Sequence, residues 1–148
     1  MDGGLIYGPT RDVIVVGYGK SDLEDLLVTA ARGQDRTVRG EETPERGSFY
    51  RSDHFNLAKV GIPVLYAQGG LDLVDGGVTR GKALSEAFVA QRYHKPTDEY
   101  DPAWDHSGQT QDLQLFYQVG RTVADGAQWP NWKPTAEFYP IRQRSLGR

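Results

Sequence analysis

The side chains that could carry out chemistry in this sequence are carboxylates and three histidines, because the chain contains no cysteine. Imidazole nitrogens and carboxylate oxygens bind zinc, and both groups can transfer protons. His94 stands in a polar stretch, residues 93–98, that contains a proline. This setting favours a loop over an apolar core. Two interpretations of His94 stay open from the residues alone: an exposed loop histidine without a chemical role, or a metal ligand.

The other histidines carry less information. His54 falls in the first turn of a predicted helix beside Asp53, whose carboxylate would interact favourably with the positive end of that helix. Asp53 is therefore equally compatible with a capping role and with a role in orienting a metal ligand. Asp98 is likewise either a solvated loop residue or an orienting residue. His106 precedes the last predicted helix, and the sequence assigns it no role.

Two familiar motifs are missing from the sequence. A serine hydrolase would need its nucleophile on a sharp turn such as Gly-x-Ser-x-Gly, which does not occur here. Gly19-Lys20-Ser21 matches the end of a phosphate-binding loop, but Ile14 stands where that motif requires its first glycine. We therefore expect neither serine-based hydrolysis nor nucleotide binding.

Composition narrows the range of partners. Of the 148 residues, 38% are hydrophobic and 25% are charged, and the net charge is -3 with scattered basic residues. This pattern argues against binding to nucleic acid, and no apolar run approaches the roughly 20 residues of a membrane span. A peptide or small molecule is the expected partner. The first four residues do not have the pattern of a signal peptide.

Strands and helices are predicted to alternate along the chain. The β-branched run at residues 13–16 predicts a buried strand. Residues 21–33 predict an amphipathic helix that begins at a Ser-x-x-Glu capping box and ends at a glycine. Further elements are predicted as strands at 37–38 and 62–67 and helices at 53–60, 82–91 and 108–124, with a rim or lid loop at 69–92 and an irregular tail at 127–148.

This alternation predicts an α/β fold with three layers, α/β/α, and a largely parallel sheet. We expect residues 1–148 to belong to a single domain. Functional sites in such sheets lie at the carboxyl ends of the strands, which draws attention to the stretch 69–94 that ends at His94.

Three segments together resemble the C-terminal half of the co-catalytic zinc aminopeptidase family, which is related to the glutaminyl cyclases. They are residues 50–66 (Tyr-Arg-Ser-Asp-His-Phe followed by Lys-Val-Gly-Ile-Pro-Val-Leu-Tyr), residues 93–100 (Tyr-His-Lys-Pro-Thr-Asp-Glu-Tyr) and residues 129–134 (Trp-Pro-Asn-Trp-Lys-Pro). The last segment resembles the tail of a secreted bacterial branch. Asp2 resembles an aspartate at a strand end that binds zinc in this family.

The resemblance implies a metallopeptidase that removes N-terminal residues from peptides with the help of two zinc ions. Asp2 would be a terminal ligand of one zinc and His94 a terminal ligand of the other. Tyr93 would donate a hydrogen bond to the oxyanion, and Asp53 and Asp98 would orient ligands. Zinc accepts both ligand types, and the chemistry would be metal-assisted hydrolysis.

The sequence also departs from the family pattern. That pattern requires a histidine, a bridging aspartate and a Glu-Glu pair ahead of the position of Asp2, and none is present. Glu41-Glu42 follows Asp2 in a polar loop and is interpreted as a solvated charge pair. One ligand for each metal is too few for tight zinc binding. We therefore expect an inactive C-terminal part of a longer, exported polypeptide, with a sheet that is incomplete at its N-terminal side and a missing N-terminal half as its partner.

Two alternatives remain. A glutaminyl cyclase shares the fold, but that branch has tryptophan directly before the ligand histidine, so Tyr93 favours hydrolysis. A non-catalytic module that lost its metal site would lack the same ligands. Residue specificity is expected to depend on the loop at 69–92.

Overall fold

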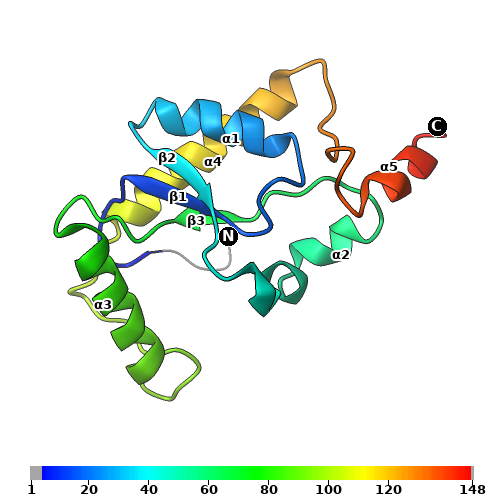
Figure 1. Cartoon of the computed structure of the whole chain (residues 1–148). Helices are drawn as coiled ribbons and strands as arrows, with labels where there is room; N and C mark the ends of the chain where they lie inside the picture. The colour runs from blue at the N-terminus through cyan, green and yellow to red at the C-terminus, as the bar shows by residue number, and fades with distance from the viewer. Residues whose placement is uncertain (1–4, 148) are drawn as a thin grey trace.

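A computed structural model of the chain describes residues 5–147 (Figure 1). Its elements follow the order β1 (Asp12–Val15), α1 (Leu23–Arg32), β2 (Thr37–Gly40), the 3-10 helices η1 (Pro44–Arg46) and η2 (Ser48–Arg51), α2 (His54–Ala58), β3 (Ala67–Gly69), α3 (Gly77–Gln91), α4 (Ser107–Asp125) and α5 (Tyr139–Ser145). The predicted α/β class is confirmed.

The sheet in the described part of the chain has three strands in the order β2-β1-β3. β1 and β2 are parallel and are joined through α1, as parallel neighbours require. β3 runs antiparallel to β1, with Ile14 opposite Gln68. The sheet is therefore mixed, and the predicted three-layer, largely parallel architecture is not confirmed. β3 begins at the last residue of the predicted strand 62–67, although the oxygen of Tyr66 already accepts from the backbone N–H of Val16 at 2.9 Å.

A first hydrophobic core lies between the sheet and the helices α1 and α4. Its buried members are Val13, Val15, Leu27, Ala31, Leu115 and Val119. Asp112 of α4 connects this helix to β3, because its carboxylate accepts a hydrogen bond from the backbone N–H of Gly69 at 2.8 Å. The same carboxylate lies 2.8 Å from the guanidinium of Arg36, and both side chains are 1% exposed. This buried ion pair fixes α4 and the end of β3 relative to one another.

A second hydrophobic core forms beyond the end of β1 and depends on the C-terminal tail. Its buried members are Val16, Phe49, Ala58, Val64, Trp132, Ala136 and Phe138. The indole N–H of Trp132 donates to the backbone oxygen of Gly61 at 3.0 Å. The tail also contains α5, so the prediction of an irregular tail over 127–148 is wrong for Tyr139–Ser145. The tail adopts fixed structure because its aromatic side chains fill a core that the rest of the chain leaves open.

The turn before α1 explains why a phosphate-binding loop is not formed here. The carboxylate of Glu24 is 3% exposed and accepts hydrogen bonds from the backbone N–H groups of Gly19, Lys20 and Ser21 at 2.7 to 3.0 Å. Only half of the predicted capping box forms: Glu24 accepts from the backbone N–H of Ser21, whereas Ser21 Oγ accepts from the backbone N–H of Leu23 at 3.2 Å and not from that of Glu24. The backbone N–H groups of Gly19, Lys20 and Ser21 are thus hydrogen-bonded to the Glu24 carboxylate and are not free to bind a phosphate.

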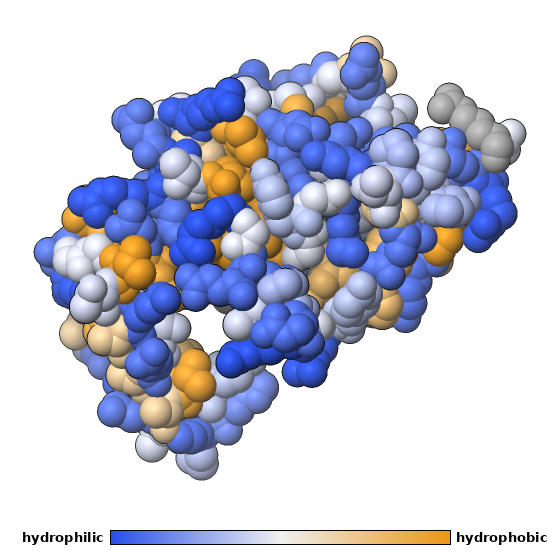
Figure 2. Space-filling view, in the orientation of Figure 1, coloured by the Kyte–Doolittle hydropathy of each residue, from blue (hydrophilic) through white to orange (hydrophobic). Residues whose placement is uncertain are grey.

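Helix α3 projects from the rest of the fold (Figure 1). It starts at Gly77, earlier than the predicted residue 82, so much of the predicted rim loop 69–92 is helical. Gly81 is its buried residue and packs on the backbone of Leu71, where a β-carbon would come within 2.0 Å of the Leu71 oxygen. Space-filling atoms show apolar and polar side chains mixed over this projection (Figure 2). We call α3 and the loop 92–106 that leads back to α4 the α3 arm.

Candidate active-site loop

Tyr93 and His94 lie directly after α3 and their rings stack on each other. The ring centroids are 4.0 Å apart and the ring planes differ by 18°. Tyr93 is 51% exposed and His94 is also exposed, so both side chains are accessible to a ligand. His94 has a φ of 57°, in the left-handed region that residues other than glycine adopt uncommonly and that histidine adopts more often than most. Such a conformation persists where the surrounding structure holds it, and it is enriched at functional sites.

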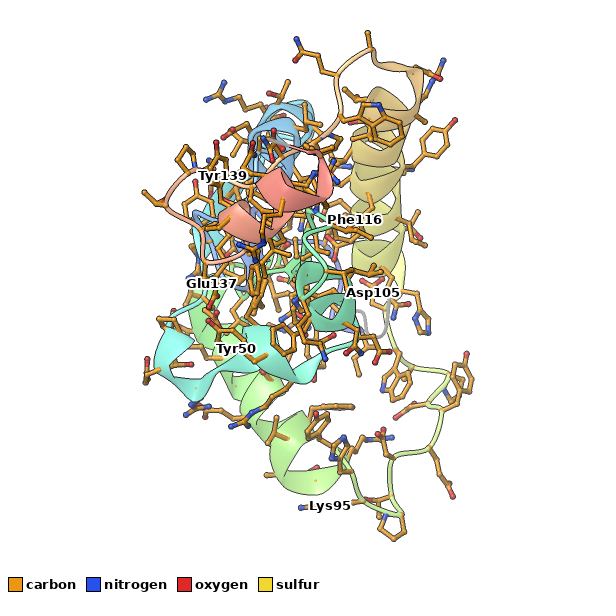
Figure 3. The ribbon with its side chains drawn as sticks, turned by 90° about the vertical axis from the view of Figure 1, so that its right-hand side faces the viewer. Tyr50, Lys95, Asp105, Phe116, Glu137 and Tyr139 are labelled. Carbon is orange, nitrogen blue, oxygen red and sulfur yellow. The ribbon has the colours of Figure 1, made fainter. Side chains whose placement is uncertain are left out.

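The loop that carries the pair is closed by local hydrogen bonds. The backbone N–H of Lys95 donates to the oxygen of Arg92 at 2.9 Å, and that of Asp98 donates to the oxygen of Lys95 at 3.0 Å. Asp98 is exposed four residues after His94, in the same loop. Lys95 marks the tip of the arm in Figure 3, far from Tyr50 and Glu137.

The far end of this loop pairs with the N-terminal segment. The backbone N–H of Asp105 donates to the oxygen of Ile6 at 3.0 Å, and the N–H of Gly8 donates to the oxygen of Asp105 at 3.1 Å. The stretch that follows Asp2 is thereby joined to the stretch that follows His94. Asp2 itself lies outside the described residues, so its predicted role as a zinc ligand stays a prediction.

Asp53 and His54 lie on a different part of the fold. Asp53 is exposed at the N-cap position of α2, as the capping interpretation placed it, but its side chain makes no capping hydrogen bond there. The ring of His54 lies between those of Phe49 and Tyr66, with centroids 4.6 and 4.9 Å away. Burial lowers the pKa of His54, and the nearby charge of Asp53 opposes this effect. α2 and α3 are well separated in Figure 1, so the structure does not bring Asp53 to the Tyr93–His94 pair.

The described residues do not form a metal site by themselves. Among residues 5–147 no group of three or more histidines and carboxylates is arranged to hold a metal ion. Glu41 accepts a hydrogen bond from the backbone N–H of Gly17 at 3.0 Å, and Glu42 lies near Arg39 and Lys82 at 3.5 and 3.4 Å. The Glu41-Glu42 pair is therefore engaged by the fold, and His94 would supply a single ligand.

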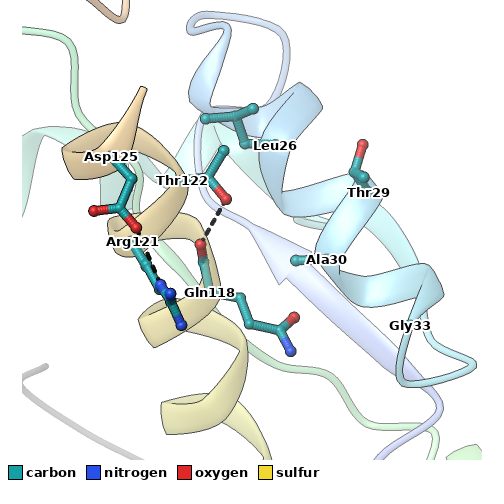
Figure 4. A pocket seen from close by; sticks show the side chains of 8 residues that line it. All are labelled: Leu26, Thr29, Ala30, Gly33, Gln118, Arg121, Thr122 and Asp125. Atoms are coloured by element: carbon teal, nitrogen blue, oxygen red, sulfur yellow. Dashed lines mark hydrogen bonds and ion pairs between the residues drawn. The ribbon is translucent and has the colours of Figure 1, made fainter. Parts of the chain in front are cut away.

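Two hollows on the described surface bear on the location of a site. One is a groove between α1 and α4 (Figure 4), lined by Leu26, Thr29, Ala30, Gly33, Gln118, Arg121, Thr122 and Asp125. It contains none of the candidate residues. The other lies in the α3 arm and is lined by Arg92, Pro96, Thr97, Glu99, Tyr100, Asp101 and Pro102. The second hollow is formed by the same loop as Tyr93 and His94.

Comparison with known families places the chain among the peptidases. It belongs to peptidase family M28, whose family model matches residues 1–118. The matched range includes the α3 arm and ends within α4. No curated protein and no solved structure matches the chain. Within residues 5–147, none of the helices combines the length and the apolar character needed to cross a membrane.

Arg92 is the residue of this loop that the sequence did not single out. Its guanidinium donates to the backbone oxygen of Glu99 at 2.9 Å and to the carboxylate of Asp101 at 3.0 Å. Its position directly before Tyr93 and His94 was the available signal. The residues that an arginine at this position would reach depend on the path of the loop, which the sequence does not reveal.

Proposed function

We propose that this chain supplies Tyr93, His94 and Asp2 to the active site of a zinc-dependent aminopeptidase. Membership of peptidase family M28 supports peptide hydrolysis as the reaction. The observation that carries the assignment of residues is the loop after α3. It presents a stacked, accessible Tyr93–His94 pair with a left-handed histidine and is joined by backbone pairing to the segment that follows Asp2.

Each side chain has a role suited to its chemistry. When bound, zinc supplies a Lewis acid for the hydrolysis of the peptide bond. The imidazole of His94 and the carboxylate of Asp2 are ligand types that zinc accepts, one for each of two ions. The Tyr93 phenol donates a hydrogen bond to the scissile carbonyl oxygen as negative charge develops on it. The partner is a peptide with a free N-terminus.

The proposal includes a contribution from outside this sequence. A zinc site needs three or four protein ligands, and no three histidines or carboxylates among residues 5–147 are grouped to supply them. The other ligands and the general base therefore come from polypeptide outside the 148 residues. The 148-residue chain on its own is proposed to be inactive, and the complete protein to be exported, as the resemblance of residues 129–134 to a secreted branch suggests.

An aminopeptidase assay tests this proposal in two forms of the protein. The 148-residue chain with added zinc should show no turnover of an aminoacyl chromogenic substrate. A longer polypeptide that completes the ligand set should be active. Its His94→Ala variant should be inactive and its His106→Ala variant active, since His106 is also exposed but lies at the opposite end of the loop 92–106, next to α4. If the 148-residue chain shows zinc-dependent turnover and His94→Ala abolishes that turnover, the claim that this chain lacks essential ligands is refuted. Full activity of the longer His94→Ala protein would refute the role of His94.

A second candidate function, a non-catalytic module, is favoured by the absence of a metal-binding cluster from residues 5–147. It predicts that no longer form of the protein hydrolyses peptides. Cyclisation of N-terminal glutamine is a further alternative within the same chemistry. Mass spectrometry of the product separates the two reactions, because hydrolysis releases a free amino acid whereas cyclisation releases ammonia and leaves the peptide chain intact.

A further inference from the structure

Arg92 connects the two sides of the loop that carries Tyr93 and His94. The residue ends α3, where its backbone N–H donates to the oxygen of Phe88 at 2.8 Å. From there its guanidinium crosses the loop to the Glu99 oxygen and the Asp101 carboxylate, at 2.9 and 3.0 Å. These two bonds use different nitrogens of the guanidinium, Nη1 and Nη2. Arg92 therefore fixes the distance between the end of α3 and the returning part of the loop.

Further contacts extend this connection to the base of the arm. The guanidinium carbon of Arg92 lies 5.6 Å from the centroid of the Trp104 ring, within the range of a cation–π interaction. Asp101 is bonded on its other side, since its Oδ1 accepts from the backbone N–H of Ala103 at 3.0 Å. Burial raises the pKa of Tyr7, and the positive charge of Arg92 opposes this effect. Arg92 therefore contacts the returning loop through Asp101 and Trp104, and its charge lies near Tyr7 of the N-terminal segment with which Asp105 pairs.

The chemistry of these contacts requires an arginine. Its planar guanidinium can donate to two acceptors in different directions while it lies over an aromatic ring. A lysine has the same charge, but its single ammonium is a compact point charge that cannot reproduce this arrangement. The bonds are also charge-assisted, which makes them stronger than those between neutral groups.

We infer that Arg92 is a positioning residue that holds Tyr93 and His94 in the stacked geometry in which the peptidase uses them. This inference rests on the proposed function for its purpose, because the position of the pair matters only if both residues act on the metal or the substrate. Arg92 itself does not touch the reacting atoms. It acts through the closed conformation of the loop, in which His94 takes its left-handed backbone.

The test compares Arg92→Lys with Arg121→Lys in the 148-residue chain. Arg121 pairs with Asp125 at 3.1 Å on α4 and lies outside the α3 arm, so its replacement is a matched loss of one arginine–carboxylate pair. The first readout is the proton spectrum of the His94 ring, which the stacked Tyr93 ring shifts by its ring current. The chain has three histidines, so His94 can be assigned from the spectrum of His94→Gln. Tyr93→Leu gives the position of the His94 signals without the ring current.

Arg92→Lys should move the His94 signals most of the way to their Tyr93→Leu positions, and Arg121→Lys should leave them unchanged. In the same samples, hydrogen exchange of the Lys95 and Asp98 amides should become faster in Arg92→Lys, on the order of tenfold, with the amides of α1 and α4 unaffected. If Arg92 only stabilised another part of the fold, Arg92→Lys would leave the signals of the His94 ring unchanged. Unchanged signals and unchanged exchange in Arg92→Lys would overturn the inference.

A zinc titration of the wild-type chain separates this inference from the proposed function. If zinc shifts the His94 signals, even weakly, the ligand role of His94 is supported. If zinc leaves them unchanged while Arg92→Lys still disrupts the stacking, the proposed ligand role fails and the positioning of the loop by Arg92 stands.

Discussion

Trp132 is the residue whose replacement tests most sharply whether the C-terminal tail is part of the folded domain. Its side chain is 2% exposed, its ring lies 5.0 Å from that of Phe138, and its indole N–H donates to the Gly61 oxygen. Trp129, three residues earlier, is 85% exposed. The same substitution at the two positions therefore removes the same atoms from very different surroundings.

The structure gives the size of the expected effect. Trp132→Ala leaves a cavity in the second core and an unpaired buried carbonyl at Gly61, and should lower the free energy of unfolding by about 3–5 kcal/mol. Trp132→Phe keeps an aromatic ring and should lose about 1–3 kcal/mol, chiefly from the unpaired Gly61 oxygen. Trp129→Ala should change the free energy of unfolding by no more than about 0.5 kcal/mol.

Urea unfolding followed by far-ultraviolet circular dichroism measures these differences without relying on tryptophan fluorescence, which the substitutions alter. Similar midpoints for Trp132→Ala and Trp129→Ala would refute the reasoning, because they would show that the tail unfolds separately from the strands and helices of residues 12–125. A lower midpoint for Trp132→Ala with an unchanged slope is the expected result.

Three further predictions follow from other parts of the structure. In a polypeptide with a complete site, Tyr93→Phe should lower kcat on the order of 100-fold, because it removes a hydrogen-bond donor to the oxyanion, and should leave KM and bound zinc unchanged. An unchanged kcat in steady-state assays would mean that Tyr93 only packs beside His94. Asp112→Ala should lower the free energy of unfolding in urea by about 3–5 kcal/mol, because it leaves the buried charge of Arg36 unpaired; a loss below about 1 kcal/mol would contradict this. Burial lowers the pKa of His54, so the unfolded chain takes up a proton more readily than the folded chain, and the free energy of unfolding should fall as the pH drops below about 6.5, the ordinary histidine pKa. His54→Phe should weaken this fall between pH 7 and 5. Equal pH dependence of the free energy of unfolding in the wild type and His54→Phe would argue against this role of His54.

Local patterns in the sequence predicted the helices that have clear boundaries. The helix predicted at 21–33 is α1, Leu23–Arg32, because the carboxylate of Glu24 at its start and an apolar face specify it locally. The helix predicted at 108–124 is α4, Ser107–Asp125, for the same kind of reason. The direction of β3 was not predictable, because the long connection 41–66 can bring a strand back in either sense. α5 was missed because Tyr139–Ser145 is short and is stabilised by tertiary packing of the tail.

The sequence could nominate residues for the candidate site but could not give its geometry. His94 in a polar loop was a candidate ligand from its residue type, and Tyr93 was added by the family resemblance; the structure shows the two rings stacked and accessible. The crossing contacts of Arg92 depend on how residues 95–104 fold back, which no local pattern specifies. Asp53 was grouped with the site by resemblance, whereas it lies exposed on α2, apart from α3.

The most direct test of the proposed function is a zinc-edge anomalous map from crystals, grown with zinc, of the longer polypeptide that completes the ligand set. The two ions of a co-catalytic pair lie about 3.5–4 Å apart and each ligand bond adds about 2 Å. The proposal therefore predicts zinc at the His94 imidazole and at the Asp2 carboxylate, with the tips of the two side chains within about 10 Å of each other. Side-chain tips farther apart than this, or zinc bound at neither residue, would contradict it.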